Sequence, residues 1–165
     1  MGSDPLLQAF EPIGIRAPVE WQANLRLDTI SDVVQDRRRR LRDFAENWLS
    51  VITSQTSIAL NRAAIGHAAS GKSNLGGIVL ANGRFAIGER LKPVLEAGRA
   101  AGLLDFDDAE TAFRTFFGLV GRDVQIRLLL GDALVSGKAE IQRDAARATD
   151  QFLALHGRLN TAPKA

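Results

Sequence analysis

The sequence contains no cysteine, which excludes disulfide bonds and thiolate chemistry for this chain. It also lacks any apolar run close to the ~18 residues that a membrane-spanning helix needs. The first residues, MGSDPLLQAF, have neither the basic start nor the continuous apolar stretch of a signal peptide. We therefore expect a soluble, cytoplasmic protein with no membrane partner.

A strong charge of one sign is missing as well. The chain has 21 Lys and Arg against 19 Asp and Glu, a net charge of +2. Although the sequence pI is about 9.5, this excess is too small to indicate binding to nucleic acid or to a membrane surface. The 165 residues are 45% hydrophobic and 24% charged, as in an ordinary globular protein, and they suffice for one domain.

Patterns typical of β-strands are not found. No segment alternates apolar and polar residues, and β-branched residues do not cluster in short runs. Apolar residues recur instead at spacings of three and four, as in the stripe that begins at Leu41 and ends at Ile52. The sequence therefore predicts an all-α fold, a bundle of five to six helices.

We predict an irregular arm over residues 1–31, which contains three prolines, and a single helical domain over residues 32–160. Pro93 should kink or end the helix that contains it. Asp107 and Glu110 have the spacing of a capping box at the start of a strongly apolar helix, which should be buried on several sides. The predicted helices cover residues 32–52, 58–69, 78–101, 108–130 and 138–155.

One short motif points to an enzyme. The string GHAASGKS, from Gly66 to Ser73, satisfies the phosphate-binding P-loop pattern, in which Lys72 would reach the phosphates. That chemistry needs a buried strand before the turn and a helix after it. The preceding SIALNRAAI has the composition of a helix, and NLGG follows with two glycines. We therefore favour a junction between a helix and a loop.

Other candidate chemistry is sparse. His67 and His156 are the only histidines, and neither has an acidic residue at metal-ligand spacing. We expect no metal, no cofactor and no enzymatic activity. The four consecutive arginines from Arg37 to Arg40 are compatible with a phosphate-binding patch, but a solvated helix face is the favoured interpretation.

From Leu41 to about Leu155, the order of these signals resembles the C-terminal regulatory domain of TetR-family transcriptional repressors. The resembling segments are LRDFAENWLSVITS, IALNRAAIGHA, FAIGERLKPVLEAGRAAGLLDFDDAETAFRTFFGLV, RLLLGD and AARATDQFLAL. Members of that family begin with a three-helix DNA-binding unit that includes a helix-turn-helix. The residues before the long helix here are too few and too rich in proline for that unit.

The resemblance implies a homodimer in which the last two long helices of each subunit form a four-helix interface. It also implies a pocket for a small, largely apolar ligand between the earlier helices and the first interface helix. The implied interface residues are Phe116, Val120, Val124, Leu128, Ile141, Ala145, Ala148 and Phe152. The candidate ligand-binding residues are Trp48, Arg62, His67, Phe85, Phe113, Phe116 and Phe117.

Three functions follow from the sequence. The first is a ligand-sensing and dimerisation domain of a TetR-type regulator that binds DNA only through a helix-turn-helix absent from this chain. The second is an interaction partner that lacks the DNA-reading head and modulates a full-length regulator. The third, which the composition disfavours, is a nucleotide-binding enzyme that uses the segment from Gly66 to Ser73.

Overall fold

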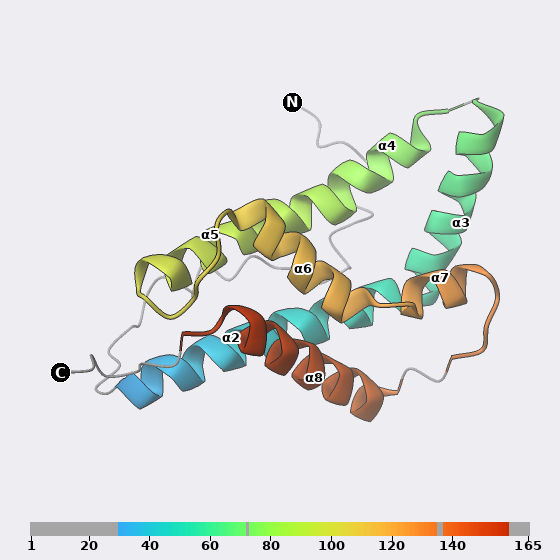
Figure 1. The fold of residues 1–165 in the computed structure, drawn as a ribbon. Coiled ribbons are helices and arrows are strands. Elements are labelled where there is room, and N and C mark those ends of the chain that lie inside the picture. Colours follow the sequence, from blue (N-terminus) through green and yellow to red (C-terminus); the bar gives the residue numbers. More distant parts are fainter. Residues whose placement is uncertain (1–29, 72, 135–136, 159–165) are drawn as a thin grey trace, which may run out of the picture.

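The computed structural model describes residues 30–71, 73–134 and 137–158, with side chains from residue 34 onward. The regular elements in these ranges are all helical, and an isolated antiparallel bridge joins Leu104 and Gly157. This confirms the all-α prediction, whereas residues 1–29 of the predicted arm lie outside the described ranges. The elements are α2 (Ile30–Ile52), α3 (Gln55–Ser70), α4 (Leu75–Leu80), the π-helical η3 (Ala81–Phe85), α5 (Ala86–Ala100), α6 (Ala109–Gly121), α7 (Val124–Leu129) and α8 (Lys138–His156) (Figure 1).

Four helices share the hydrophobic core, with α2 packed on α8, α8 on α6, and α6 on α5. Phe116 of α6 is fully buried, and its ring centroid lies 5.2 Å from that of Phe152 on α8 and 6.3 Å from that of Phe44 on α2. Burial of such a side chain contributes about 1.5–3 kcal/mol. The buried cluster comprises Leu41, Ala45, Trp48, Leu49, Ile52, Ile87, Leu91, Leu95, Leu104, Ala112, Phe113, Phe116, Val120, Ala145, Ala148 and Phe152.

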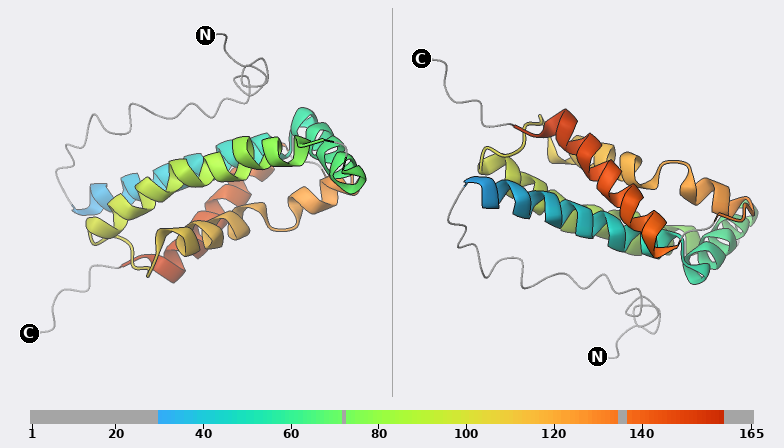
Figure 2. Two further views of the ribbon diagram at one scale, coloured as in Figure 1. Left: turned by 90° about the horizontal axis from the view of Figure 1, so that it is seen from above. Right: turned by 90° about the horizontal axis from the view of Figure 1, so that it is seen from below.

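The remaining elements extend this body. Helices α4, η3 and α5 form one continuous rod, and α3 and α7 lie together at one end of the molecule (Figures 1 and 2). Of these, α3 buries Ser57, Ile58 and Ala64, while α4, η3 and α7 bury no residue fully. The end built from α3, α4 and α7 is therefore packed much less completely than the four-helix body.

The irregularity in the rod lies at η3 rather than at Pro93, where the sequence predicted a kink or a boundary. Helix α5 continues through Pro93 because Leu91 and Leu95, on either side of it, are fully buried. Their burial offsets the backbone hydrogen bond that proline cannot make. At the π-turn, the side-chain amide of Asn82 donates to the carbonyl of Ile78 at 2.9 Å.

Residues 108–130 form two helices, so the prediction of one continuous helix was wrong. Helix α6 ends at Gly121, and Arg122 has a φ of 43° before α7 begins. Glycine weakens a helix at this point, and Gly121 also lies against α2, where an added Cβ would be 3.7 Å from Cη2 of Trp48. Helix α7 is consequently a separate element that packs against α3.

The start of α6 also differs in detail from the predicted capping box. Asp108, not Asp107, is the N-cap, and its carboxylate accepts a hydrogen bond from the backbone N–H of Thr111 at 2.8 Å. The carboxylate of Glu110 pairs with Arg84 and Lys92, which belong to the rod. Long-range cations compete for this glutamate, and a local sequence pattern cannot reveal them.

Arg62 of α3 holds the C-terminal end of α7. Its Nη2 donates to the carbonyl of Leu128 at 2.7 Å, and its Nε donates to the carbonyl of Leu129 at 3.1 Å. The last carbonyls of a helix have no partner within that helix, and a cation there also interacts favourably with the helix dipole. Arg62 therefore acts as a cap that a different helix supplies.

The close approach of α5 and α6 gives a first prediction. A Cβ at Gly88 would lie 3.1 Å from Cε1 of Phe113, whereas Gly66 of α3 has no atom within 4 Å of that position. Gly88→Ala is expected to lower the free energy of unfolding by about 1–3 kcal/mol through overpacking. Gly66→Ala, the matched control, should raise it by about 0.5–1 kcal/mol. Urea unfolding monitored by circular dichroism measures both, and an unchanged or more stable Gly88→Ala would contradict the packing described here.

The capping of α7 gives a second prediction. Arg62→Met keeps the length of the side chain but removes its donors, so the amides of α7 should exchange with solvent about tenfold faster. Arg143→Met on α8 is the control, because Arg143 pairs with Glu140 in its own helix. Hydrogen exchange read by mass spectrometry compares the peptides of α7 and α8 in both variants. Equal exchange of α7 in the two would show that Arg62 does not hold it.

Candidate functional site

Three of the aromatic residues predicted to bind a ligand lie together between α2 and α6. The ring centroids of Trp48 and Phe117 are 3.9 Å apart, and those of Phe113 and Phe117 are 5.5 Å apart. Trp48 and Phe113 are buried and Phe117 is half-buried. Phe116 points to the other side of α6, where it packs on Phe44 and Phe152 in the core.

Arg84 of η3, which no sequence motif marks, connects this cluster to the rod. Its guanidinium carbon lies 5.2 Å from the ring centroid of Phe113, 5.6 Å from that of Phe117 and 5.7 Å from that of Phe85. Phe85 is 52% exposed, and the side chain of Arg84 is 29% exposed. A cation is therefore held among three rings at the edge of the core.

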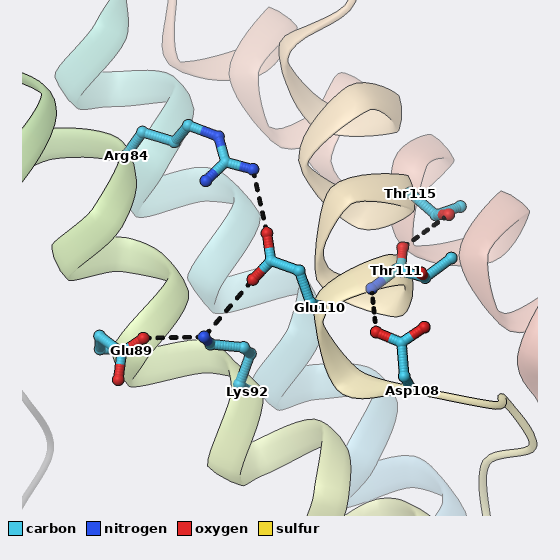
Figure 3. Close-up of polar contacts among 7 residues, drawn as sticks. All are labelled: Arg84, Glu89, Lys92, Asp108, Glu110, Thr111 and Thr115. Carbon is cyan, nitrogen blue, oxygen red and sulfur yellow. Dashed lines mark hydrogen bonds and ion pairs between the residues drawn. The ribbon is translucent and has the colours of Figure 1, made fainter.

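Acidic groups complete the site (Figure 3). Nη2 of Arg84 donates to Oε1 of Glu110 at 3.3 Å, and Nζ of Lys92 lies 3.4 Å from Oε2 of the same carboxylate. Lys92 also pairs with Oε1 of Glu89, one turn earlier in α5, at 2.7 Å. The site thus contains two cations and two carboxylates, which alternate along one network.

Hydrogen bonds shift the pKa values of three groups at the site. The hydrogen bond from Arg84, together with the charge of Lys92, lowers the pKa of Glu110. The hydrogen bond to Glu89 is the main reason that the pKa of Lys92 is raised. At the N-terminus of α6, the helix that carries Glu110, the hydrogen bonds from Thr111 lower the pKa of Asp108. The shifts favour the charged forms of Glu110, Lys92 and Asp108.

A sequence signal for this arrangement exists, although it was interpreted differently. Glu110, Phe113 and Phe117 follow one another at spacings of three and four, so they share one face of α6. The sequence predicts Phe113 and Phe117 as ligand-binding residues, but it assigns Glu110 to a helix cap. The identity of the cation opposite that face depends on how η3 is placed, which is a tertiary property.

The two polar residues predicted to contact a ligand, Arg62 and His67, lie on α3. The guanidinium of Arg62 is engaged by the end of α7, as described above. His67 is exposed, and its Nδ1 lies 2.9 Å from Oγ of Ser73. No interaction joins either residue to the aromatic cluster among the contacts of the described residues.

The segment that matches the P-loop pattern has a helix where that motif requires a strand. Helix α3 continues through Gly66 to Ser70, and Gly71 ends it with a φ of 62°. Such a left-handed glycine is a common helix C-cap. The following α4 starts at Leu75 and is six residues long. Lys72, which would reach the phosphates, lies outside the described residues.

The four arginines near the start of α2 each have a partner within the chain. The first donates to the carbonyl of Leu103, the second pairs with Asp150, and the last two pair with Asp36 one turn earlier. Partial burial opposes ionisation of Asp36, but the hydrogen bonds from the two arginines outweigh it and lower its pKa. The run therefore joins α2 to α8 and to the α5–α6 connection.

The predicted interface residues fall into two groups. Five are buried against their own chain, while Val124, Leu128 and Ile141 keep part of their surface exposed. These three side chains therefore have surface that a second subunit could contact. The buried residues are Phe116, Val120, Ala145, Ala148 and Phe152.

No group of three or more His, Asp or Glu side chains is placed to hold a metal ion among the residues of known placement. None of the helices in the described ranges is both long enough and apolar enough to cross a membrane.

Comparison with known proteins identifies the family. The sequence profile of the AefR-like transcriptional repressor C-terminal domain, a TetR-type domain, matches residues 39–158. A TetR transcriptional regulator from Agrobacterium tumefaciens has a similar structure, with a TM-score of 0.67 and 40% sequence identity. The similarity covers 75% of this chain and 62% of the Agrobacterium protein, so the chain spans less than two thirds of that relative. The comparison with curated proteins gives no significant match.

A second structure shows the same fold at lower identity. It is a TetR-family transcriptional regulator, described as putative, from Mesorhizobium loti, with a TM-score of 0.65 and 19% identity over 77% of this chain and 67% of the relative. The profile match spans most of the described helices, from within α2 to the end of α8. On this evidence the chain belongs to the TetR family of transcriptional regulators, and the described helices are its C-terminal domain.

Proposed function

We propose that this chain is the small-molecule-sensing and dimerisation domain of a TetR-type transcriptional regulator of the cytoplasm. The observation that carries the proposal is the match of residues 39–158 to the C-terminal domain of AefR-like repressors. The described helices correspond to the regulatory part of the family. DNA reading would therefore fall to a segment outside them, and the chain would act by sensing rather than by catalysis.

The uneven packing of the molecule supports a ligand site where η3, which continues α4, meets α6. Helices α4 and η3 bury no residue fully, and Leu80 and Phe85 are about half exposed. Phe117, which lies across the guanidinium of Arg84 from Phe85, is half-buried and stacks on Trp48 of α2. A small, largely apolar ligand placed here would cover apolar surface that the chain itself leaves open, which is the usual driving force for such binding.

The site is also suited to communication, because it touches helices that serve other contacts. Trp48 belongs to α2, which packs along α8, and Phe117 belongs to α6, which also packs against α8 and α5. A ligand that binds one arrangement of these helices more tightly would shift the population toward it. In a dimer, such a shift changes the spacing of whatever is attached to the two copies of α2.

For dimerisation we propose the outward sides of α6, α7 and α8. The inward sides of α6 and α8 already form the core, as the burial of Phe116 and Phe152 shows. On α7, Ile126 is 53% exposed, and Leu130 just after it is exposed as well. A symmetric pair of subunits would cover these apolar side chains, whereas a monomer leaves them in water.

The ligand site is tested with Trp48 as a reporter. Trp21→Phe removes the other tryptophan, so the fluorescence comes from the residue that stacks on Phe117. Screening of small apolar compounds, neutral and anionic, should yield ligands that raise the Tm and change this fluorescence. Phe85→Ala should weaken their binding about tenfold while the free protein keeps its Tm, because Phe85 is half exposed. Ligands that raise the Tm without any change at Trp48 would place the site elsewhere.

The interface is tested by size-exclusion chromatography with light scattering. The protein at micromolar concentration is expected to elute with twice the 17.9-kDa mass of the chain. Ile126→Glu should shift it to the monomer, because a carboxylate would be buried without a partner at the proposed interface. Ile65→Glu on α3 is the control, since Ile65 has a similar exposure of 57%. A wild-type monomer, or a dimer insensitive to Ile126→Glu, would contradict the proposal.

A further inference from the structure

Arg84 has hydrogen-bonding capacity that the described chain does not use. A guanidinium has five N–H donors, and the hydrogen bond that it makes within the described residues goes to Oε1 of Glu110. Its other neighbours are the faces of Phe85, Phe113 and Phe117, which attract the cation but accept no conventional hydrogen bond. The remaining N–H groups are therefore available to an incoming acceptor.

Glu110 can share or release Arg84 without becoming an isolated charge. Its second oxygen lies 3.4 Å from Nζ of Lys92, and this ion pair does not involve Arg84. The side chain of Glu110 is also 47% exposed, so water can solvate it. Exchange of Glu110 for another carboxylate at Arg84 thus replaces one charge-assisted hydrogen bond by another at low cost.

The backbone that carries Arg84 is unusual as well. Arg84 and Phe85 lie in the π-turn η3, a conformation that is rare in proteins and often found at functional sites. The turn places the cation beside the face of α6 that carries Glu110 and Phe117, and it leaves the neighbouring ring of Phe85 half exposed. An exposed ring and a partly exposed cation are therefore adjacent in one turn.

Building on the proposed sensing function, we propose that the ligand is an aromatic carboxylic acid, whose carboxylate binds Arg84 in competition with Glu110 and whose ring packs on Phe85 and Phe117. The charge balance favours a single negative charge. Arg84 and Lys92 are matched by Glu110 and Glu89, so a dianion such as phosphate would face two carboxylates. A cationic ligand is disfavoured, because the positive charge of Arg84 already lies against the three rings and would repel it.

The test uses 1-naphthoate and its neutral counterpart 1-naphthamide, which differ in charge but hardly in shape. Isothermal titration calorimetry measures the affinity of both for the wild-type protein and for three variants. Arg84→Gln removes the cation, Glu110→Gln removes the competing carboxylate, and Arg114→Gln changes an exposed arginine of α6 as the matched control. Thermal melting of each variant verifies that it is folded.

The wild type should bind 1-naphthoate at least about tenfold more tightly than 1-naphthamide. Arg84→Gln should remove this preference, Glu110→Gln should strengthen the binding of the acid, and Arg114→Gln should leave both affinities unchanged. Weaker binding of the acid by Glu110→Gln would overturn the competition. A preference that survives Arg84→Gln, or no binding of the acid at millimolar concentration, would overturn the assignment of Arg84. Equal binding of acid and amide would also overturn it while leaving the sensing function intact.

Discussion

The structure depends on the way in which α6 packs against three helices at once. One side of α6 places Phe116 against Phe44 and Phe152, and this contact ties α2 and α8 together in the core. The other side directs Phe113 and Phe117 toward η3 and Trp48. One helix therefore connects the core to η3.

This division also separates the stable part of the molecule from the adaptable part. The four-helix body has a continuous buried cluster, whereas α4, η3 and α7 bury no residue fully. Regions with few buried contacts open at lower free energy, and binding sites are drawn from such regions. The proposed sensing function requires this combination, since one part has to respond while the other keeps its shape.

Much of the fold could be predicted from the sequence, because periodicity and turn chemistry are local. The last helix was predicted to within one residue. Leu155 of its predicted apolar stripe is 64% exposed, whereas the other four members share one face and are at least partly buried: Ile141, Ala145, Ala148 and Phe152. The pattern showed that this face is apolar, but it could not tell whether its neighbour is the same chain or a second subunit. In the structure, the last three of these side chains are buried against their own chain.

The missed features all depend on long-range contacts. The break at Arg122 follows two glycines, one of which lies against Trp48 of α2. Asp108 caps α6, and Glu110 pairs with Arg84 and Lys92 of the rod instead of completing a capping box. Arg84 has no distinguishing local sequence context, so only the tertiary structure shows that it faces three rings. The segment that matches the P-loop pattern is the opposite case, because its local sequence fits a motif that the fold does not support. The residues before Gly71 form a helix, whereas a P-loop requires a strand there.

The most direct measurement of the central claim is hydrogen exchange by mass spectrometry with and without 1-naphthoate. If the site lies between η3 and α6, the acid will slow the exchange of amides in η3 and α6, because ordering of Arg84 and Phe85 stabilises the π-turn. The exchange of peptides from α8 should change little. Protection confined to α8, or found only around Gly66 and Ser73, would contradict the account.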